Sequence, residues 1–412
     1  MFQRNLPSGR SSSRSHGGNT AAYPALSPEE TALEWELCLQ LQRNPFINVL
    51  SLSEKIKSLY SIFRRGGIPE TSPPFVQDQE SGNLLYQILD SPQLATLFTR
   101  LCGVKLITLH VACIEHFRAY KRLPDSLMIS LPTNLQFAAE GGYAVVERGI
   151  INGNAFVAVK RLNMQTGGET PTLLQLINEA LIWRFLKHKH IVPFLGVTNN
   201  SMSPIPALVS VWQPGGDLSA YSKRLDLTNN DRNDKILGLL SGLEFMHLHG
   251  FVHGDLHTWN VLIDGSGNAM LIDFGLSVVA AARNQQFTSA RGGDPPTKAP
   301  ELLAVDLLGQ ARPTVKSDIY SFSLIVVEVY TGTRAYEPFR VAGWTPLHRN
   351  AAIIEGTLRP NLEGLGMDRK LIQLLQRCWD SDPDRRPFVQ EVKKEMEEIV
   401  CRGRRAATGR RG

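Results

Sequence analysis

Three polar side chains in the second half of the chain have the types and the spacing that phosphoryl transfer needs. Asp255 and Asn260 are five positions apart, and Asp273 opens an Asp-Phe-Gly sequence thirteen positions after Asn260. An enzyme that transfers phosphate needs a carboxylate at the incoming hydroxyl and oxygen ligands for magnesium, because it contributes mainly positioning and charge neutralisation. We therefore expect Asp255 to receive or orient the hydroxyl proton, and Asn260 and Asp273 to hold Mg²⁺. Each acid alone is more often a turn residue or a helix cap, so the prediction depends on all three together.

The sequence around these residues resembles the signature set of eukaryotic protein kinases. Upstream, Val-Ala-Val-Lys at 157–160 is similar to the strand that carries the phosphate-binding lysine. Further motifs follow in the family's order: Ala-Pro-Glu at 299–301, Asp-Ile-Tyr-Ser-Phe at 318–322, Cys-Trp at 378–379 and Pro-Asp-Arg-Arg-Pro at 383–387. The resemblance covers about residues 126–400. It is strongest to the tyrosine-kinase-like branch, particularly the large fungal group of that branch.

This resemblance implies an α+β, two-lobed protein kinase fold with a small β-rich N-lobe and a larger helical C-lobe. A change from β-rich sequence after about residue 131 to helical sequence after about residue 230 agrees with it. The resemblance also implies ATP and Mg²⁺ as cofactors. The implied catalytic residues are Lys160, Glu179, Asp255 and His257, and the implied metal ligands are Asn260 and Asp273. The implied nucleotide-binding residues are Gly141, Val146, Ala158, Lys160, Ser210, Val211, Gln213 and Leu262.

The resemblance gives several of these residues a specific part. Ser210 is the implied gatekeeper, residues 211–213 are the hinge whose backbone receives adenine, and Ala158 and Leu262 enclose the base. Lys160 is implied to pair with Glu179. Glu301 and Arg386 are implied to form a buried ion pair that braces the substrate platform, which is a structural role, and losing one partner of such a pair costs about 3–5 kcal/mol.

Two segments depart from the family pattern. The glycine loop, 139–144, keeps only the middle one of three glycines, Gly141, so we expect a looser backbone cradle for the phosphates. Gly254 stands where many kinases carry an arginine that grips a phosphate on the activation segment. Phosphorylation of Thr288 or Ser289 is therefore not expected to order that segment through this contact.

A third departure involves two positions together. His257 replaces the usual catalytic-loop lysine, and Asp294 stands where serine/threonine kinases carry a threonine that touches the catalytic aspartate and the lysine. A hydrogen-bonded His257–Asp294 pair would replace the lost contact and keep the loop packed. Two independent changes at the surface explain the pattern equally well, so both interpretations stay open.

The remaining sequence divides into tails and one helical region. Residues 1–26 are rich in Ser, Gly, Arg and Asn, which predicts a disordered tail, and residues 402–412 form a basic tail. Ser27, Pro28 and Glu30 make a helix start, and apolar residues recur at helical spacing to about residue 123. We predict that 27–123 is a small helical bundle, and a role in binding a protein partner stays open. The kinase motifs begin beyond it, so we expect 126–400 to carry its own core.

Composition indicates which partners and which compartment to expect for the protein. Without the eight arginines of the two tails, 36 of the 44 basic residues remain against 39 acidic ones, so a nucleic-acid partner is not expected. The five cysteines are scattered, which favours reduced thiols. We find no apolar run long enough to span a bilayer and no apolar secretory segment. We predict a cytoplasmic protein, with a nuclear location left open.

Three functions from different classes fit the sequence. The first is a protein kinase acting on protein hydroxyls, with serine or threonine favoured over tyrosine. The second is a pseudokinase that serves as a partner-binding or scaffold module, which the altered glycine loop and His257 favour. The third is a phosphotransferase of small molecules such as aminoglycosides or choline. Against the third stands the Ala-Pro-Glu motif with its distant Arg386, because that platform docks peptides.

Overall fold

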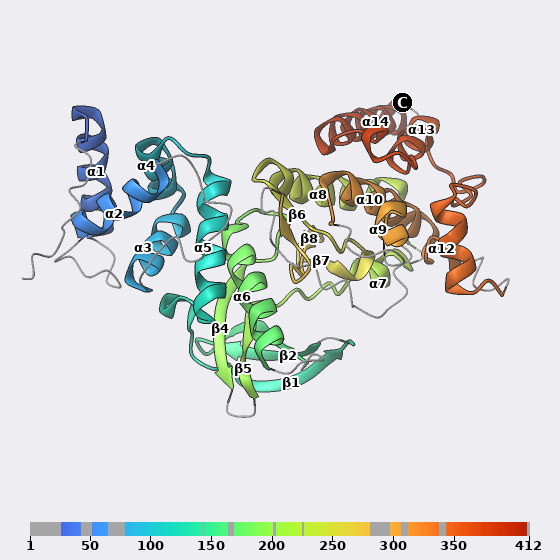
Figure 1. Cartoon of the computed structure of the whole chain (residues 1–412). Coiled ribbons are helices and arrows are strands. Elements are labelled where there is room, and N and C mark those ends of the chain that lie inside the picture. The colour runs from blue at the N-terminus through green and yellow to red at the C-terminus, as the bar shows by residue number, and fades with distance from the viewer. Residues whose placement is uncertain are drawn as a thin grey trace, which may run out of the picture.

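A computed structural model of the chain describes residues 26–42, 52–64, 79–142, 144–163, 169–200, 203–224, 226–280, 297–305, 312–337 and 343–409. Figure 1 shows a group of N-terminal helices, a sheet with helix α6, and a helical part that holds the C-terminus. The expected disordered tail lies outside the described residues except for Leu26.

The N-terminal part consists of helices, as the sequence predicts. They are α1 (Pro28–Leu41), α2 (Leu52–Arg64), α3 (Gln79–Asp90), α4 (Pro92–Cys102) and α5 (Leu106–Tyr120). The start of α1 is the predicted capping box, in which Ser27 Oγ accepts a hydrogen bond from the Glu30 amide at 3.2 Å and Glu30 Oε2 accepts one from the Ser27 amide at 2.7 Å. Helices α3 and α5 approach closely at Gly82, where a Cβ atom would lie 1.9 Å from the ring of His116.

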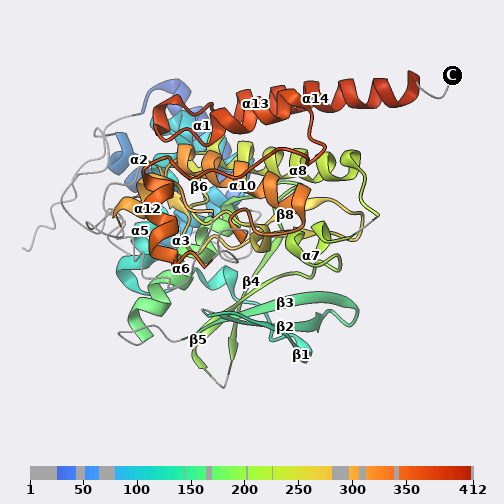
Figure 2. The same ribbon diagram turned by 90° about the vertical axis from the view of Figure 1, so that its right-hand side faces the viewer.

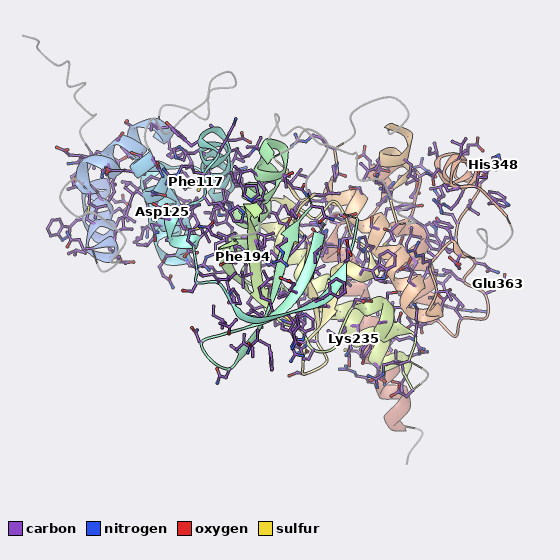
Figure 3. All side chains as sticks on the ribbon, turned by 90° about the horizontal axis from the view of Figure 1, so that it is seen from below. Phe117, Asp125, Phe194, Lys235, His348 and Glu363 are labelled. Carbon is purple, nitrogen blue, oxygen red and sulfur yellow. The ribbon has the colours of Figure 1, made fainter. Side chains whose placement is uncertain are left out.

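The N-lobe contains a five-stranded antiparallel sheet in the order β1-β2-β3-β5-β4. Its strands are β1 (Thr133–Glu140), β2 (Ala144–Ile151), β3 (Ala155–Leu162), β4 (Phe194–Asn200) and β5 (Ser203–Val211), and helix α6 (Glu169–Phe185) joins β3 to β4. The segment that follows α5 is attached to this sheet, because the Ile129 amide donates to the carbonyl of Val197 in β4 at 2.8 Å. Figure 3 labels Phe194 of β4 and Phe117 of α5.

The C-lobe is mainly helical, with short strands around the catalytic segment. Its helices are α7 (Leu218–Ser222), α8 (Asn229–Leu248), α9 (Pro300–Val305), α10 (Val315–Thr331), α12 (Pro346–Ile354), α13 (Arg369–Cys378) and α14 (Val389–Gly409). Its strands are β6 (Phe251–Val252), β7 (Val261–Ile263), β8 (Ala269–Leu271) and β9 (Val278–Val279). Helix α14 continues into the expected basic tail, where Arg404 pairs with Asp234 of α8, and Figure 2 shows its end projecting from the lobe.

One buried apolar cluster runs through all three parts of the molecule. It includes Leu37 and Phe98 from the N-terminal helices, Trp183 from α6, and Phe251 and Leu324 from the C-lobe. The helices before residue 123 therefore pack onto the core of the two lobes, and the expectation that residues 126–400 carry their own core stays a prediction. Helical periodicity predicted that their apolar faces are buried without indicating against what.

Among the described residues, no single helix has the length and apolar composition to cross a membrane. Helices α4 and α5 together meet that test, but their axes meet at 104° and most of their apolar side chains belong to the buried cluster.

A chain that begins at residue 124 is expected to be less stable than the full chain. Removing α3 and α5 uncovers Phe185 and Phe251, and each large apolar side chain that loses its cover costs about 1.5–3 kcal/mol. For a domain of this size we expect the midpoint of thermal unfolding to fall by about 5 °C or more. Thermal denaturation and gel filtration of the two chains test this. A truncated chain that is monomeric and has the same midpoint of thermal unfolding as the full chain would contradict this expectation.

Candidate active site

A half-buried lysine in the N-lobe joins two carboxylates. Nζ of Lys160, in β3, lies 2.7 Å from Glu179 Oε1 and 2.9 Å from Asp273 Oδ1. Burial of Lys160 opposes its positive charge, but the facing carboxylates of Asp273 and Glu179 outweigh that effect and raise the pKa of the lysine. Lys160 is therefore a fixed cation at neutral pH. Three residues that the sequence placed at the site, from three separate segments, meet at one point.

Helix α6 holds Glu179 in that position. Glu179 is fully buried, and on the same helix Trp183 stacks on Phe194 of β4 with ring centroids 5.1 Å apart. Trp183 also lies 5.6 Å from the ring of Phe274, which follows Asp273. Helix α6 therefore contacts both the sheet and the Asp-Phe-Gly segment, so its position decides whether the ion pairs of Lys160 can form.

Two acidic side chains of α10 form hydrogen bonds that hold the segment that carries Asp255. The Asp318 carboxylate accepts hydrogen bonds from the backbone amides of His253, at 2.8 Å, and Gly254, at 2.9 Å, and from His247 Nε2, at 2.9 Å. Further along the segment, Glu328 Oε2 accepts a hydrogen bond from the Thr258 hydroxyl at 2.8 Å. Burial raises the pKa of Glu328, although this hydrogen bond opposes the shift. Both acids of α10 thus hold the catalytic segment.

The sequence did not predict these two roles. Asp318 was noted as part of a family motif, and Glu328 was not singled out. The signal that could have found them is a pair of acids in a mostly apolar helix, residues 315–331, because buried carboxylates require hydrogen-bond donors.

The predicted proton acceptor and metal ligand lie side by side in this segment. Nδ2 of Asn260 donates to the backbone carbonyl of Asp255 at 2.8 Å, which turns the amide so that its oxygen is the remaining donor to a metal. His257 Nε2 lies 3.9 Å from Asp255 Oδ2. Asp273 has a φ of 63°, a left-handed backbone conformation that aspartate tolerates better than most residues do. Asp294, the expected partner of His257, lies outside the described residues, so that pairing stays a prediction.

The residues expected to face the nucleotide share one face of the sheet. Val146 is paired with Lys160 across β2 and β3, and Ala158 is paired with Ser210 across β3 and β5. Directly opposite residues of paired strands point to the same face, and alternate residues along β3 do too. Val146, Ala158 and Ser210 therefore line the face that carries Lys160. The opposite face packs Val157 and Val159 into a small separate core.

The hinge residues follow at the end of β5. The side chain of Gln213 is buried and its Nε2 donates to the carbonyl of Val211 at 3.2 Å, one of the backbone groups expected to receive adenine. Beyond the hinge, Asp217 forms a β-bridge with Leu262 of β7. The structure thus ties Leu262, the residue predicted to lie below the base, to the segment that follows the hinge.

Gly141 and Gly254 differ in how much room the structure leaves for a side chain. A Cβ at Gly141 would lie 3.9 Å from the carbonyl oxygen of Ala144, an ordinary contact, so the turn of the glycine loop does not itself require glycine. Gly254 has a φ of +79°, and a Cβ there would lie 2.8 Å from the carbonyl oxygen of Leu276. Close backbone packing, which sequence alone does not reveal, therefore favours glycine at 254. Thr288 and Ser289 lie outside the described residues.

The predicted brace of the substrate platform is present. Arg386 is buried and donates two hydrogen bonds to the carboxylate of Glu301, each of 2.7 Å. The guanidinium also donates to the carbonyls of Asp380 and Lys316 at 2.8 and 3.0 Å. This two-bond geometry holds α9 against the segment before α14. Glu301 itself is half-buried, whereas the guanidinium is fully buried and depends on its carboxylate partner.

Comparison with known proteins agrees with this geometry. Residues 134–396 match the family model of protein tyrosine and serine/threonine kinases, more than half of the chain, and the chain belongs to this family. Similar proteins include a probable serine/threonine-protein kinase of Dictyostelium discoideum, 28% identical over 262 residues, and serine/threonine-protein kinase STY46 of Arabidopsis thaliana, 27% identical over 229 residues. These alignments cover 63% and 55% of this chain but 27% and 37% of the relatives, so the chain spans well under half of their length. The resemblance to protein kinases and the two-lobed fold are confirmed.

Replacing Gly254 by alanine is expected to lower stability by about 1–3 kcal/mol, because the left-handed backbone and the contact with Leu276 both oppose a side chain. Gly103 is the matched control, since its φ is +67° and a Cβ there meets nothing within 4 Å. Urea denaturation of Gly254→Ala and Gly103→Ala separates the backbone strain from the steric contact. Equal losses of stability in the two variants would show that the close contact at 254 has no effect.

Proposed function

We propose that this chain is an ATP- and Mg²⁺-dependent protein kinase that transfers the γ-phosphate to serine or threonine hydroxyls of protein substrates in signalling. The observation that carries the proposal is the position of Lys160, bonded at once to Glu179 and Asp273. A cation held in this way by two carboxylates can align the α- and β-phosphates of ATP. The names of the similar proteins, which include serine/threonine-protein kinases, support the choice of hydroxyl.

The metal ligands fit Mg²⁺ by their chemistry. Asp273 offers a carboxylate and Asn260 an amide oxygen. Mg²⁺ prefers oxygen ligands and keeps several waters, so one or two protein ligands with the phosphates are enough. When bound, the ion neutralises phosphate charge. In the protein itself, Asp255 would orient the substrate hydroxyl and take its proton, with Asn260 fixing the backbone carbonyl of that residue.

The substrate class and the location of the protein belong to the same proposal. The Glu301–Arg386 pair supports a platform for a peptide rather than a small molecule. All five cysteines are free thiols, four of them buried, which supports a reducing compartment and a cytoplasmic location.

The pseudokinase alternative has an observation of its own. The Gln213 amide bonds the Val211 carbonyl that adenine is expected to use, and the glycine loop lacks two of the usual glycines. A chain that binds partners through its surface and transfers no phosphate would tolerate both features. Incubation of the full chain with labelled ATP and Mg²⁺, followed by mapping of phosphorylated residues, decides between the two functions and identifies the hydroxyl.

Lys160→Met is expected to lower the rate of phosphate transfer by about a hundredfold or more, since it removes a preorganised positive charge at the phosphates. Lys393→Met is the control, because it removes another lysine that is paired with a glutamate, Glu244, in the C-lobe. A phosphate-release or peptide-phosphorylation assay measures both. If Lys160→Met kept the wild-type rate, the assignment of Lys160 would be wrong.

Asp273→Asn is expected to weaken nucleotide binding in the presence of Mg²⁺ more than in its absence, because the carboxylate acts through the ion. The shift of the unfolding midpoint by ATP, with and without Mg²⁺, measures the difference. Equal losses under the two conditions would contradict a metal-binding role for Asp273.

A further inference from the structure

The C-terminal end of α6 is held by the end of α3. Asp90, the last residue of α3, accepts two hydrogen bonds from Arg184, 2.7 Å from Nε and 2.9 Å from Nη2. Lys187, just after α6, adds a contact of 2.8 Å to the same carboxylate and one of 2.6 Å to the Asp90 carbonyl. Burial opposes the charge of Asp90, but the hydrogen bonds from Arg184 and Lys187 prevail and lower its pKa. This carboxylate is therefore ionised at neutral pH.

Aromatic side chains of α3 and α5 cover the same end of α6. The ring of Phe185 stacks on that of His110 in α5, with centroids 4.4 Å apart and planes 20° apart. Tyr86 of α3 lies 6.3 Å from Phe185 on another side. Burial lowers the pKa of His110 to about 3, so the imidazole is neutral at physiological pH and acts as an aromatic plate. Charge and stacking thus fix one end of α6 in two independent ways.

Helix α5 also reaches the catalytic segment. The centroid of the His110 ring also lies 5.4 Å from that of Phe251, two residues before His253. Next to it, a Cβ at Gly250 would lie 2.8 Å from Cγ1 of Ile107 at the start of α5. The same helix therefore contacts α6, beside which it lies in Figure 1, and also the region of β6 in the C-lobe.

The geometry of α6 transmits this contact to the active site. Glu179 lies five residues before Arg184 on the same helix, which is about 7.5 Å along its axis at 1.5 Å per residue. A helix moves as a rigid element over such a distance. Holding Arg184 and Phe185 in place therefore also holds Glu179 at the distance where it bonds Lys160.

We propose that helices α3 and α5 of the N-terminal part are a built-in positioning element for α6, with Asp90 and His110 as positioning residues. They keep Glu179 bonded to Lys160 without a separate activating protein. The effect of these helices on the rate of phosphate transfer rests on the proposed kinase function. Their effect on the position of α6 does not depend on that function. If the helices only added buried apolar area, removing the charge of Asp90 would not change how often α6 opens locally.

The test compares two carboxylates on the same helix. Asp90→Ala removes the contacts with Arg184 and Lys187, whereas Glu80→Ala removes the pair that α3 makes with Lys55 of α2, away from α6. Asp90→Glu is the conservative variant that keeps the charge. Hydrogen exchange of the amides of α6 in the full chain reports its opening directly, and ATP kinetics report the consequence.

We expect Asp90→Ala to speed exchange across α6 about tenfold, equivalent to about 1.4 kcal/mol, with Glu80→Ala unchanged and Asp90→Glu intermediate. For phosphate transfer we expect a lower kcat with a smaller change in the KM for ATP. Exchange of α6 that stays at the wild-type rate in Asp90→Ala would overturn the proposal. Faster exchange of α6 in Asp90→Ala, together with a wild-type chain that transfers no phosphate, would support the proposal and contradict the kinase function alone.

A second pair of variants covers the case in which Asp90→Ala fails to fold. His110 Nδ1 is buried and has no hydrogen-bond partner among the described residues, so His110→Phe keeps the stacking at no polar cost. We expect His110→Phe to keep the slow exchange of α6 and His110→Ala to speed it. Equal exchange rates in these two variants would defeat the proposal, because they would show that stacking on Phe185 does not hold the helix.

Discussion

The bond between Lys160 and Glu179 joins a strand of the sheet to a helix packed beside it, and it forms only in one position of that helix. Lys160 sits in β3 and cannot move without breaking strand pairing, so α6 has to bring Glu179 to it. The carboxylate of Glu179 is fully buried, and without the lysine its charge would be left without a partner, which is costly. The position of α6 is therefore the constraint on which the centre of the site depends, together with Asp273 from the C-lobe.

In both lobes, one charged side chain is paired with several groups at once. In the N-lobe, Lys160 forms ion pairs with the carboxylates of Glu179 and Asp273. In the C-lobe, the Asp318 carboxylate accepts hydrogen bonds from two backbone amides and one imidazole. The two amides belong to His253 and Gly254, which directly precede Asp255. Each of these groups is satisfied only when segments distant in sequence come together, so the polar contacts specify one arrangement of the catalytic segment and disfavour others.

Sequence reasoning was most successful where chemistry is carried by residue type and order. The resemblance to protein kinases implied that Lys160 pairs with Glu179, which the structure shows, and the start of α1 followed from a local capping box. The site features that sequence did not predict depend on the folded backbone. Nothing in the residues around Gly254 shows that the carbonyl of Leu276 leaves no room for a side chain. Likewise, the bond from Gln213 to Val211 depends on a rotamer that only the packed hinge defines.

The N-terminal helices show a different limit. Their apolar periodicity predicted burial, but a helix face carries no information about which surface covers it. The ion pair of Asp90 with Arg184 links residues 94 positions apart, and either partner alone reads as an ordinary surface charge. The ring contacts of His110, which stacks on Phe185 and lies tilted to Phe251, likewise need three separate segments. Because these contacts converge on the helix that carries Glu179, a region that sequence treats as a separate bundle is physically part of the surroundings of the active site.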